Sequence, residues 1–587
     1  MGPLGNLCRK PAQPNTTVTQ PTADTQVQKP SPSPPPPGMA EQLQPPFNNA
    51  DPATAADPRE RERCAELMLA YIYSNLPNCP LYDGTRFTAL AASRGADRLS
   101  RLPHDVLRNV IARLPVKDAA RTAVLSSRWR ALWRSTPLVL ADIHLLPKAQ
   151  ALRPKPSNSP AVTAAVSRIL EAHPGPFACV HLICSQMDGY RARLARWLQL
   201  LAAKGAQDLV LVNRPWPLDV PLPATLFTVT TLTRLHVGVW KLPGTAALRG
   251  ASFPRLRELG LYFVEMEQGL VDSLVARSPV LEVLNIVGCI NGGLRLRLVS
   301  QSLRCVQICG SVLEDIAVVK APRLERLILI ESCKIARGLC TRLRIVDAPK
   351  LHIFGYLEPG QVLEVGETVI MVVHLQSLHW FSYQILSTDD SLNCVMFLLE
   401  FVKFQPGIKA SASAMLTSVK ILTLNVRFGV RNDVKMVPTF LKCFPNAERL
   451  HIVSEKGDYE AGSARLNLNF WKLVKPTENI KSCIKVFSYK EFRGELGEVA
   501  FLKFFFRNAR VLSTASVSMA NPSFTSFSMD EATHKAQEAS KKMASSYCEV
   551  VLLGSTGPEG GKPWSFKTGT DYSFEDPFSV VHIRHNA

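Results

Sequence analysis

The 587-residue sequence predicts an α/β protein in which a short helical unit precedes a long array of repeated strands. Two observations predict this fold. The apolar motif LxxLxL recurs five times between residues 232 and 329, and three short amphipathic helices fit residues 98–137. The length allows several folded units, and 46% hydrophobic against 20% charged residues allows a sizeable buried core.

The N-terminal part of the chain changes in composition near residue 57. Residues 1–60 hold 14 of the 43 prolines, so we expect residues 1–56 to form a disordered, Pro-rich arm. Residues 57–96 are predicted to be a helical linker segment whose helix ends near Asn75–Pro77. The apolar residues that recur there at helical spacing are Leu67, Met68, Tyr71 and Ile72.

Residues 97–137 predict three short helices in succession. The first opens after Leu102–Pro103, because proline favours a helix start, and it stops at Pro115. The second runs from about 117 to 125, and Ser126 is suited to cap the third helix at its N-terminus. The first and third helices each carry an apolar stripe, formed by Leu107, Val110, Ile111 and Leu114 and by Trp129, Leu132 and Trp133.

The charge of this helical unit is unbalanced. Eight basic and two acidic side chains lie between residues 101 and 134, together with two tryptophans. Three helices of this length bury little apolar surface on their own. The composition therefore predicts a unit that docks on an acidic partner.

The string LSRLPHDVLRNVIARLPVKDAARTAVLSSRWRALWRSTP, residues 99–137, resembles the F-box over its whole length. The resemblance implies docking onto a Skp-type linker protein, which connects an F-box protein to the cullin and RING subunits of an SCF ubiquitin ligase. We assign Val110 and Ala123 to ordinary helix packing. The residues expected to contact the linker are Leu102, Pro103, Leu107, Ile111, Leu114, Val116, Leu125 and Trp129.

The repeated motif has the spacing of leucine-rich repeats, with steps of 24, 25, 22 and 21 residues. Its copies start at Leu232, Leu256, Leu281, Leu303 and Leu324. In such a strand the motif leucines point into a solenoid, and the residues between them face outward along a concave sheet. We therefore expect a leucine-rich-repeat solenoid over residues 138–470. Strands near Leu422 and Leu450 extend it beyond a poorly patterned stretch at 360–415.

A solenoid usually binds partners on its extended surface and performs no chemistry. The residues between the motif leucines are therefore candidates for binding a target protein. They are Arg257, Glu258, Glu282, Asn285, Arg304, Gln307, Glu325 and Arg326. For each of these residues alone, a plain solvated strand position explains the pattern equally well.

The segment that begins at residue 483, CIKVFSYKEFRGELGEVAFLKFFFRNARVLS, predicts a strand, a break at Gly494 and a helix. The helix is expected to turn Leu496, Val499, Leu502 and Phe506 inward. This segment resembles the FBD module that follows leucine-rich repeats in many plant F-box proteins. We place an FBD-like module at 471–530, and the order of the three parts points to that plant family. Residues 531–587 carry no pattern that predicts a structure.

The sequence shows no catalytic, cofactor-binding or metal-binding motif. The Gly-rich loop GSTGPEGGKPW at 554–564 lacks the glycine spacing and the Ser or Thr of a phosphate-binding loop. The 14 cysteines include no CxxC pair. We therefore expect a non-catalytic protein without cofactor or metal.

The predicted function is that of a substrate-recruiting F-box adaptor in an SCF-type ubiquitin ligase, with an unknown target protein held by the repeats. Scattered cysteines favour a reducing compartment, the nucleus or the cytoplasm, and no apolar run reaches the length of a membrane span. A leucine-rich-repeat scaffold without ubiquitin transfer is the main alternative. The formal charge of +19 leaves nucleic-acid binding as a third, although no basic block with interleaved aromatics supports it.

Overall fold

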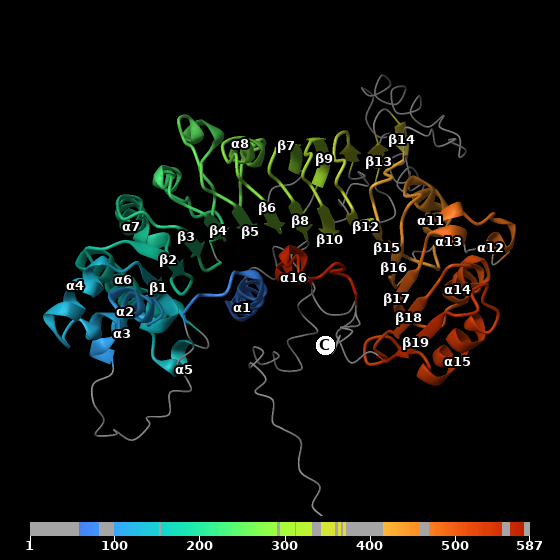
Figure 1. Cartoon of the computed structure of the whole chain (residues 1–587), viewed down its shortest axis with the longest axis horizontal. Coiled ribbons are helices and arrows are strands. Elements are labelled where there is room, and N and C mark those ends of the chain that lie inside the picture. Colours follow the sequence, from blue (N-terminus) through green and yellow to red (C-terminus); the bar gives the residue numbers. More distant parts are fainter. Residues whose placement is uncertain are drawn as a thin grey trace, which may run out of the picture.

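The computed structural model describes residues 58–81, 99–151, 154–215, 217–289, 294–311, 313–330, 342–357, 362–365, 368–370, 415–456, 469–554 and 564–579. The proline-rich arm predicted at 1–56 and most of the poorly patterned stretch at 360–415 lie outside these residues. The described parts form an arched solenoid with strands along its inner side and helices along its outer side (Figure 1). The predicted α/β class is confirmed.

A parallel sheet forms the inner layer of the arch. Within the described residues it has 14 strands, arranged in chain order. Parallel neighbours need a crossover connection, and the crossovers supply the outer layer. The strands are β1 (Leu138–Ala141), β2 (Phe177–Leu182), β3 (Asp208–Val212), β4 (Arg234–Gly238), β5 (Glu258–Tyr262), β6 (Val283–Val287), β8 (Cys305–Cys309), β10 (Arg326–Ile330), β12 (Ile353–Leu357), β15 (Ile421–Val426), β16 (Arg449–Ser454), β17 (Val486–Phe492), β18 (Thr514–Met519) and β19 (Glu549–Leu553).

One apolar residue per strand occupies the same register position along this whole sheet. In the predicted repeats it is the middle residue of the LxxLxL motif, so Leu235 pairs with Leu259 and Leu259 with Leu284. We call this row the apolar ladder, and all its members except Val550 are fully buried. The ladder runs through Leu140, Val180, Leu209, Leu235, Leu259, Leu284, Val306, Leu327, Phe354, Leu422, Leu450, Phe487, Ala515 and Val550.

The outer layer contains a second sheet and a series of helices. The second sheet follows the order β14-β13-β11-β9-β7 and lies over the middle of the arch (Figure 1). Its strands are β7 (Leu294–Val299), β9 (Leu313–Lys320), β11 (Arg342–Ile345), β13 (Val362–Val365) and β14 (Thr368–Ile370). The helices of this layer are α6 (Ser159–Ala172), α7 (Arg191–Ala203), α8 (Leu270–Ala276), α11 (Arg431–Cys443), α12 (Phe470–Leu473), α13 (Glu478–Ser482), α14 (Leu496–Asn508) and α15 (Met529–Ser540). A short helix, α5 (Lys148–Ala151), lies outside this layer, at the lower end of the arch (Figure 1).

The three predicted N-terminal helices are present as α2 (His104–Ala112), α3 (Val116–Thr122) and α4 (Ser127–Ser135), after a 3-10 turn at Leu99–Arg101. The predicted N-cap is confirmed, because the Ser126 hydroxyl accepts a hydrogen bond from the Trp129 N–H at 3.4 Å. Both α2 and α3 contact β1. The unit therefore covers the first strand of the solenoid and ends the sheet on that side (Figure 1).

The segment that resembles an FBD module continues the same sheet through β17 and β18, with α14 between them. Three of the four residues predicted to face inward from α14 are buried, namely Val499, Leu502 and Phe506. The prediction for Leu496 is wrong, since its side chain is 66% exposed. Leu496 is the first residue of the helix, and the next two residues, Gly497 and Glu498, are the ones that this first turn buries.

A buried carboxylate fastens α14 to two strands of the sheet. Glu498 Oε1 accepts hydrogen bonds from the hydroxyls of Ser454 on β16, at 2.6 Å, and Tyr489 on β17, at 3.4 Å. Its Oε2 accepts the backbone N–H groups of Arg493, at 3.0 Å, and Glu495, at 2.9 Å. Burial raises the pKa of Glu498 to about 7, although these donors favour the charged form.

We expect Glu498→Ala to lower the free energy of unfolding by roughly 2–4 kcal/mol, because buried donors lose their acceptor. Thermal unfolding followed by circular dichroism would show a lower Tm. Glu531→Ala is the matched control, since Glu531 is an exposed carboxylate that pairs with Lys535 on the surface of α15. Equal Tm values for the two variants would contradict the role of Glu498.

Candidate docking surfaces

The side chains predicted to contact a Skp-type linker divide into buried and accessible groups. Leu107, Ile111, Val116 and Trp129 are at most 6% exposed and belong to the core that the three helices share with the solenoid. Their contact with a linker stays a prediction, and what the structure shows is that their side chains are buried. The physical reason is size, because helices of seven to nine residues need these side chains to pack on β1.

The accessible group extends beyond the predicted residues. Pro103 is exposed, and Leu102 and Leu114 are half-buried. Of the predicted set, Leu125 is the large apolar side chain that stands out, at 66% exposed, and Val124 beside it is 79% exposed. We call the exposed apolar residues of this unit the apolar surface, which consists of Leu99, Val106, Val110, Val124 and Leu125.

The assignment of Val110 to helix packing is wrong. Val106 and Val110 are one turn apart on α2 and therefore share a face, which lies about 100° around the helix from the buried pair Leu107 and Ile111. A nine-residue helix with two apolar stripes cannot bury both against one core. That double stripe is the signal in the sequence that could have identified Val106 and Val110.

The residues predicted to line the concave face lie on or just before β5, β6, β8 and β10. Arg257 and Glu282 form an exposed ion pair at 2.6 Å, and Arg304 pairs with Glu325 at 2.7 Å. Glu258 Oε1 lies 3.2 Å from His236 Nε2. The prediction of exposure is wrong for Asn285, Gln307 and Arg326, which are at most 2% exposed.

Two segments cover the concave face. One is the predicted N-terminal helix, present as α1 (Pro58–Asn75), which lies inside the arch (Figure 1). Its apolar side chains Met68, Leu69, Tyr71 and Ile72 pack against outward-facing residues from β3 to β8. Polar contacts hold both of its ends. Arg214 Nη2 lies 2.9 Å from Glu62 Oε1, and the Tyr73 hydroxyl donates to the Ile183 carbonyl at 2.8 Å.

The other is a C-terminal segment, residues 564–579, which we call the strap and which contacts Gln307 and Arg326. It includes α16 (Phe566–Thr570) and lies beside α1 on the inner side of the arch (Figure 1). The Phe566 N–H donates to Asn75 Oδ1 at 3.0 Å, so the strap and α1 meet. From there the strap crosses β8 and β10 towards β16 and β17. No pattern in the sequence distinguished it from the unassigned tail at 531–587.

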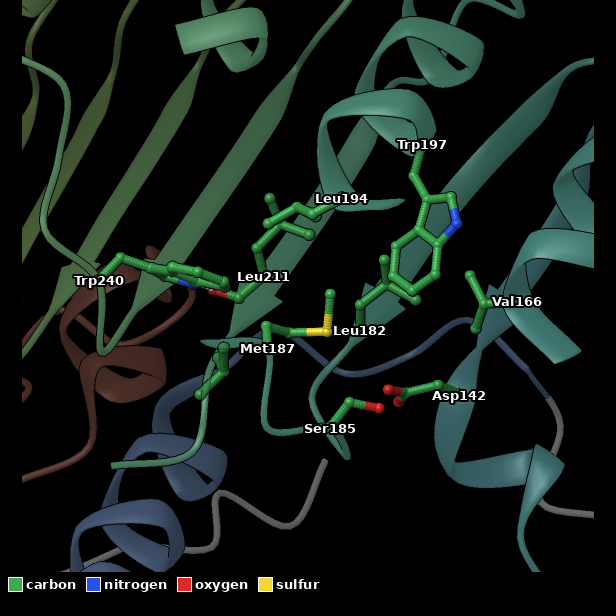
Figure 2. A pocket seen from close by; sticks show the side chains of 10 residues that line it. Asp142, Val166, Leu182, Ser185, Met187, Leu194, Trp197, Leu211 and Trp240 are labelled. Atoms are coloured by element: carbon green, nitrogen blue, oxygen red, sulfur yellow. Dashed lines mark hydrogen bonds between the residues drawn. The ribbon is translucent and has the colours of Figure 1, made fainter. Parts of the chain in front are cut away.

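A small enclosed pocket lies between β2, β3 and the helices α6 and α7. Figure 2 shows Asp142 and Ser185 close together at one side of it, surrounded by apolar side chains from Val166, Leu182, Met187, Leu194, Trp197, Leu211 and Trp240. Asp142 Oδ2 accepts the backbone N–H groups of Ile183 and Cys184, each at 2.9 Å. The carboxylate thus holds the loop after β2, and we assign the pocket a structural role.

Burial raises the pKa of Asp142 to about 6, although the hydrogen bonds from Cys184 and Ile183 oppose this shift. Unfolded chains lose this proton near pH 4. The folded state therefore binds more protons between about pH 4 and pH 6, and stability decreases as the pH rises through that window.

Chemical sites are not evident in the described part of the chain. Over those residues, no group of three or more His, Cys, Asp or Glu side chains could hold a metal ion. Likewise, none of the described helices is both long and apolar enough to cross a bilayer. The fold and surfaces instead define a leucine-rich-repeat solenoid with a helical docking unit at one end and a concave face covered by α1 and the strap.

Comparison with protein families supports each part of this description. The F-box domain family matches residues 99–140, and the FBD family matches residues 475–517. The family of leucine-rich repeats from the FBD-associated F-box protein At5g56370 matches residues 194–387 and 392–452. The chain belongs to the plant F-box proteins that carry leucine-rich repeats and an FBD domain.

Individual relatives come from Arabidopsis thaliana. F-box/FBD/LRR-repeat protein At1g13570 is 23% identical over 406 residues, which covers 62% of this chain and 93% of the relative. Putative F-box/FBD/LRR-repeat protein At5g44950 is 23% identical over 472 residues, covering 78% of this chain and 100% of the relative. F-box/LRR-repeat protein At3g59200 is 32% identical over a shorter stretch of 196 residues, 32% of this chain and 36% of the relative.

We expect Asp142→Asn to remove the pH dependence that this carboxylate causes. Asparagine keeps an oxygen that can accept both N–H groups and has no proton to lose. Between pH 4 and pH 8 this carboxylate should cost the parent roughly 2–3 kcal/mol of its free energy of unfolding, and the variant should not lose this amount. Denaturant unfolding at both pH values measures this change. If the free energies of unfolding of variant and parent differ by the same amount at pH 4 and at pH 8, Asp142 does not cause this pH dependence.

Proposed function

We propose that the protein is a substrate-recruiting adaptor of an SCF-type ubiquitin ligase. In this role the F-box docks on a Skp-type linker, and through it on cullin and RING subunits, while the solenoid holds a target protein. The observation that carries the proposal is the apolar surface of Leu99, Val106, Val110, Val124 and Leu125, left uncovered on an otherwise basic unit. Several exposed large apolar side chains on one short unit favour a binding site.

The energetics of the apolar surface suit a protein partner. Full burial of one Val or Leu side chain contributes about 1.5–3 kcal/mol, so Val124 and Leu125 alone supply a substantial part of a micromolar affinity. The surrounding arginines, among them the exposed Arg101, Arg113 and Arg130, favour an acidic surface opposite. Both features fit the linker that the F-box family implies.

The proposed mechanism needs no catalytic residue in this chain. The packing of α2 and α3 on β1 joins the F-box to the solenoid, so a target held by the solenoid stays at a defined distance from the linker. Tethering raises the effective concentration of a target lysine at the charged conjugating enzyme. We place this function in the nucleus or the cytoplasm, where reduced thiols such as those of the buried Cys179 and Cys443 persist.

The test is binding of the full chain to a purified Skp-type linker, measured by isothermal titration calorimetry. We expect the parent to bind and Val124→Asp/Leu125→Asp to lose at least about tenfold in affinity, because two charges would enter an apolar contact. Both positions are exposed, so the Tm should stay unchanged. Failure of the parent to bind any Skp-type linker would exclude the adaptor function.

The matched control is Leu473→Asp. Leu473 lies on α12, far from the F-box in the arch, and is 82% exposed (Figure 1). This variant should bind the linker as the parent does. If Val124→Asp/Leu125→Asp binds equally well, the assignment of the apolar surface is wrong even if the linker is bound elsewhere on the F-box.

A further inference from the structure

The concave face binds the strap largely through the backbone of the strap. Arg326 Nη1 donates a hydrogen bond to the Gly569 carbonyl at 2.7 Å, and Arg326 Nη2 donates to the Phe574 carbonyl at 2.8 Å. Lys490 Nζ donates to the Phe578 carbonyl at 2.8 Å. Carbonyl groups are common to all peptides, so these donors could serve any extended segment that follows the same path.

Aromatic side chains of the strap occupy defined positions on this face. The centre of the Tyr572 ring lies 4.0 Å from the guanidinium of Arg304 and 4.4 Å from that of Arg326, and both distances favour cation–π attraction. Phe566 and Phe578 are each 1% exposed. Phe578 packs in an apolar cluster with Ile328, Ile353 and Ile421. The face therefore selects for aromatic side chains at both ends of the bound segment.

The charges of the two partners are complementary. The strap carries three acidic side chains and one basic side chain. Asp576 Oδ2 lies 3.0 Å from His451 Nε2 and 3.5 Å from Arg449 Nη1. Burial alone would raise the pKa of Asp576, but His451 and Arg449 outweigh it and lower that pKa to about 2. The carboxylate is thus recognised in its charged form.

Three residues predicted from the sequence to recognise a target take part in these contacts. Arg304 and Arg326 hold Tyr572, and Gln307 donates to the Phe566 carbonyl at 3.1 Å and accepts from Trp564 Nε1 at 2.9 Å. Their ligand in this structure is the strap. A face that binds backbone carbonyls, aromatic rings and a carboxylate has the chemistry of a peptide-binding site.

We propose that the concave face from β8 to β17 is a peptide-binding groove, and that the strap occupies it in competition with a target segment of the same chemistry. Such a segment is extended and acidic, with aromatic residues near both ends and an Asp two positions before the last of them. This inference rests on the proposed adaptor function, for which it names the class of target. A tethered occupant acts at an effective concentration on the order of millimolar, so it lowers the apparent affinity for targets.

The strap also contains a position at which it can be weakened without changing the groove. A Cβ atom at Gly569 would lie 1.9 Å from Gln307 Oε1 and 3.0 Å from the Trp564 ring. The Gln307 side chain cannot move away freely, because it also donates to Asn285 Oδ1 at 3.0 Å. A large side chain at Gly569 therefore opposes docking of the strap.

The experiment uses the full chain and a fluorescein-labelled peptide of residues 564–579, with binding followed by fluorescence anisotropy. The peptide should bind Phe566→Ala/Phe578→Ala at least about tenfold more tightly than it binds the parent, in which the tethered strap competes. Gly569→Leu is the second strap variant and should behave in the same way. A peptide with Ala at the positions of Phe566, Tyr572, Asp576 and Phe578 should bind neither variant.

Substitutions in the groove provide the matched controls. Adding Arg326→Ala to either strap variant should abolish the gain in peptide binding. Adding Arg257→Ala should leave the gain intact, because Arg257 pairs with Glu282 at the exposed rim. Peptide binding that survives Arg326→Ala, or that disappears equally with Arg257→Ala, would overturn the assigned groove.

Binding of the Skp-type linker by the same preparations separates this inference from the adaptor function. If the strap variants retain the parent's Tm and linker binding but bind the peptide no better than the parent, the groove is overturned and the adaptor function stands. If peptide binding increases as expected but no preparation binds a linker, the adaptor function fails and the groove stands.

Discussion

The apolar ladder is the constraint on which the fold depends. A single leucine-rich repeat presents one row of apolar side chains and cannot bury it without a neighbour on each side. The ladder satisfies this need from Leu140 to Val550 without a break in register among the described strands. At its first strand the need is met by α2 and α3, which contact β1. The F-box is thus part of the solenoid core.

Each strand of the solenoid also has an outward face, and apolar side chains on that face need to be covered as well. On β3 this face carries Val210 and Val212, which would be exposed to solvent in a bare solenoid. The helix α1 covers them with Met68 and Ile72. Further along, where the outward residues are polar, the strap supplies carbonyls and carboxylates as hydrogen-bond partners. The strap also covers apolar outward residues, because Phe578 packs with Ile328, Ile353 and Ile421.

The F-box divides its apolar side chains between stability and recognition. On α2 the pair Leu107 and Ile111 enters the core, whereas Val106 and Val110 remain at the surface. We expect removal of a buried residue from this unit to affect folding. The exposed residues can be altered while the solenoid stays intact, and the packing on β1 keeps their face in a fixed orientation relative to the repeats.

Local patterns in the sequence were sufficient to predict the helices of the F-box, the N-cap at Ser126 and the register of the repeats. Helical and strand periodicities depend on residues that are close in the chain. They also identified Arg304, Gln307 and Arg326 as outward-facing residues. They could not show what faces those residues, since Gln307 and Phe566 are 259 positions apart and their contact exists only once the chain has closed the arch. The division of apolar residues on α2 was likewise decided by the packing of the helix on β1. Periodicity tells which side chains share a face, and tertiary packing decides whether that face meets solvent, the core or the chain's own strap.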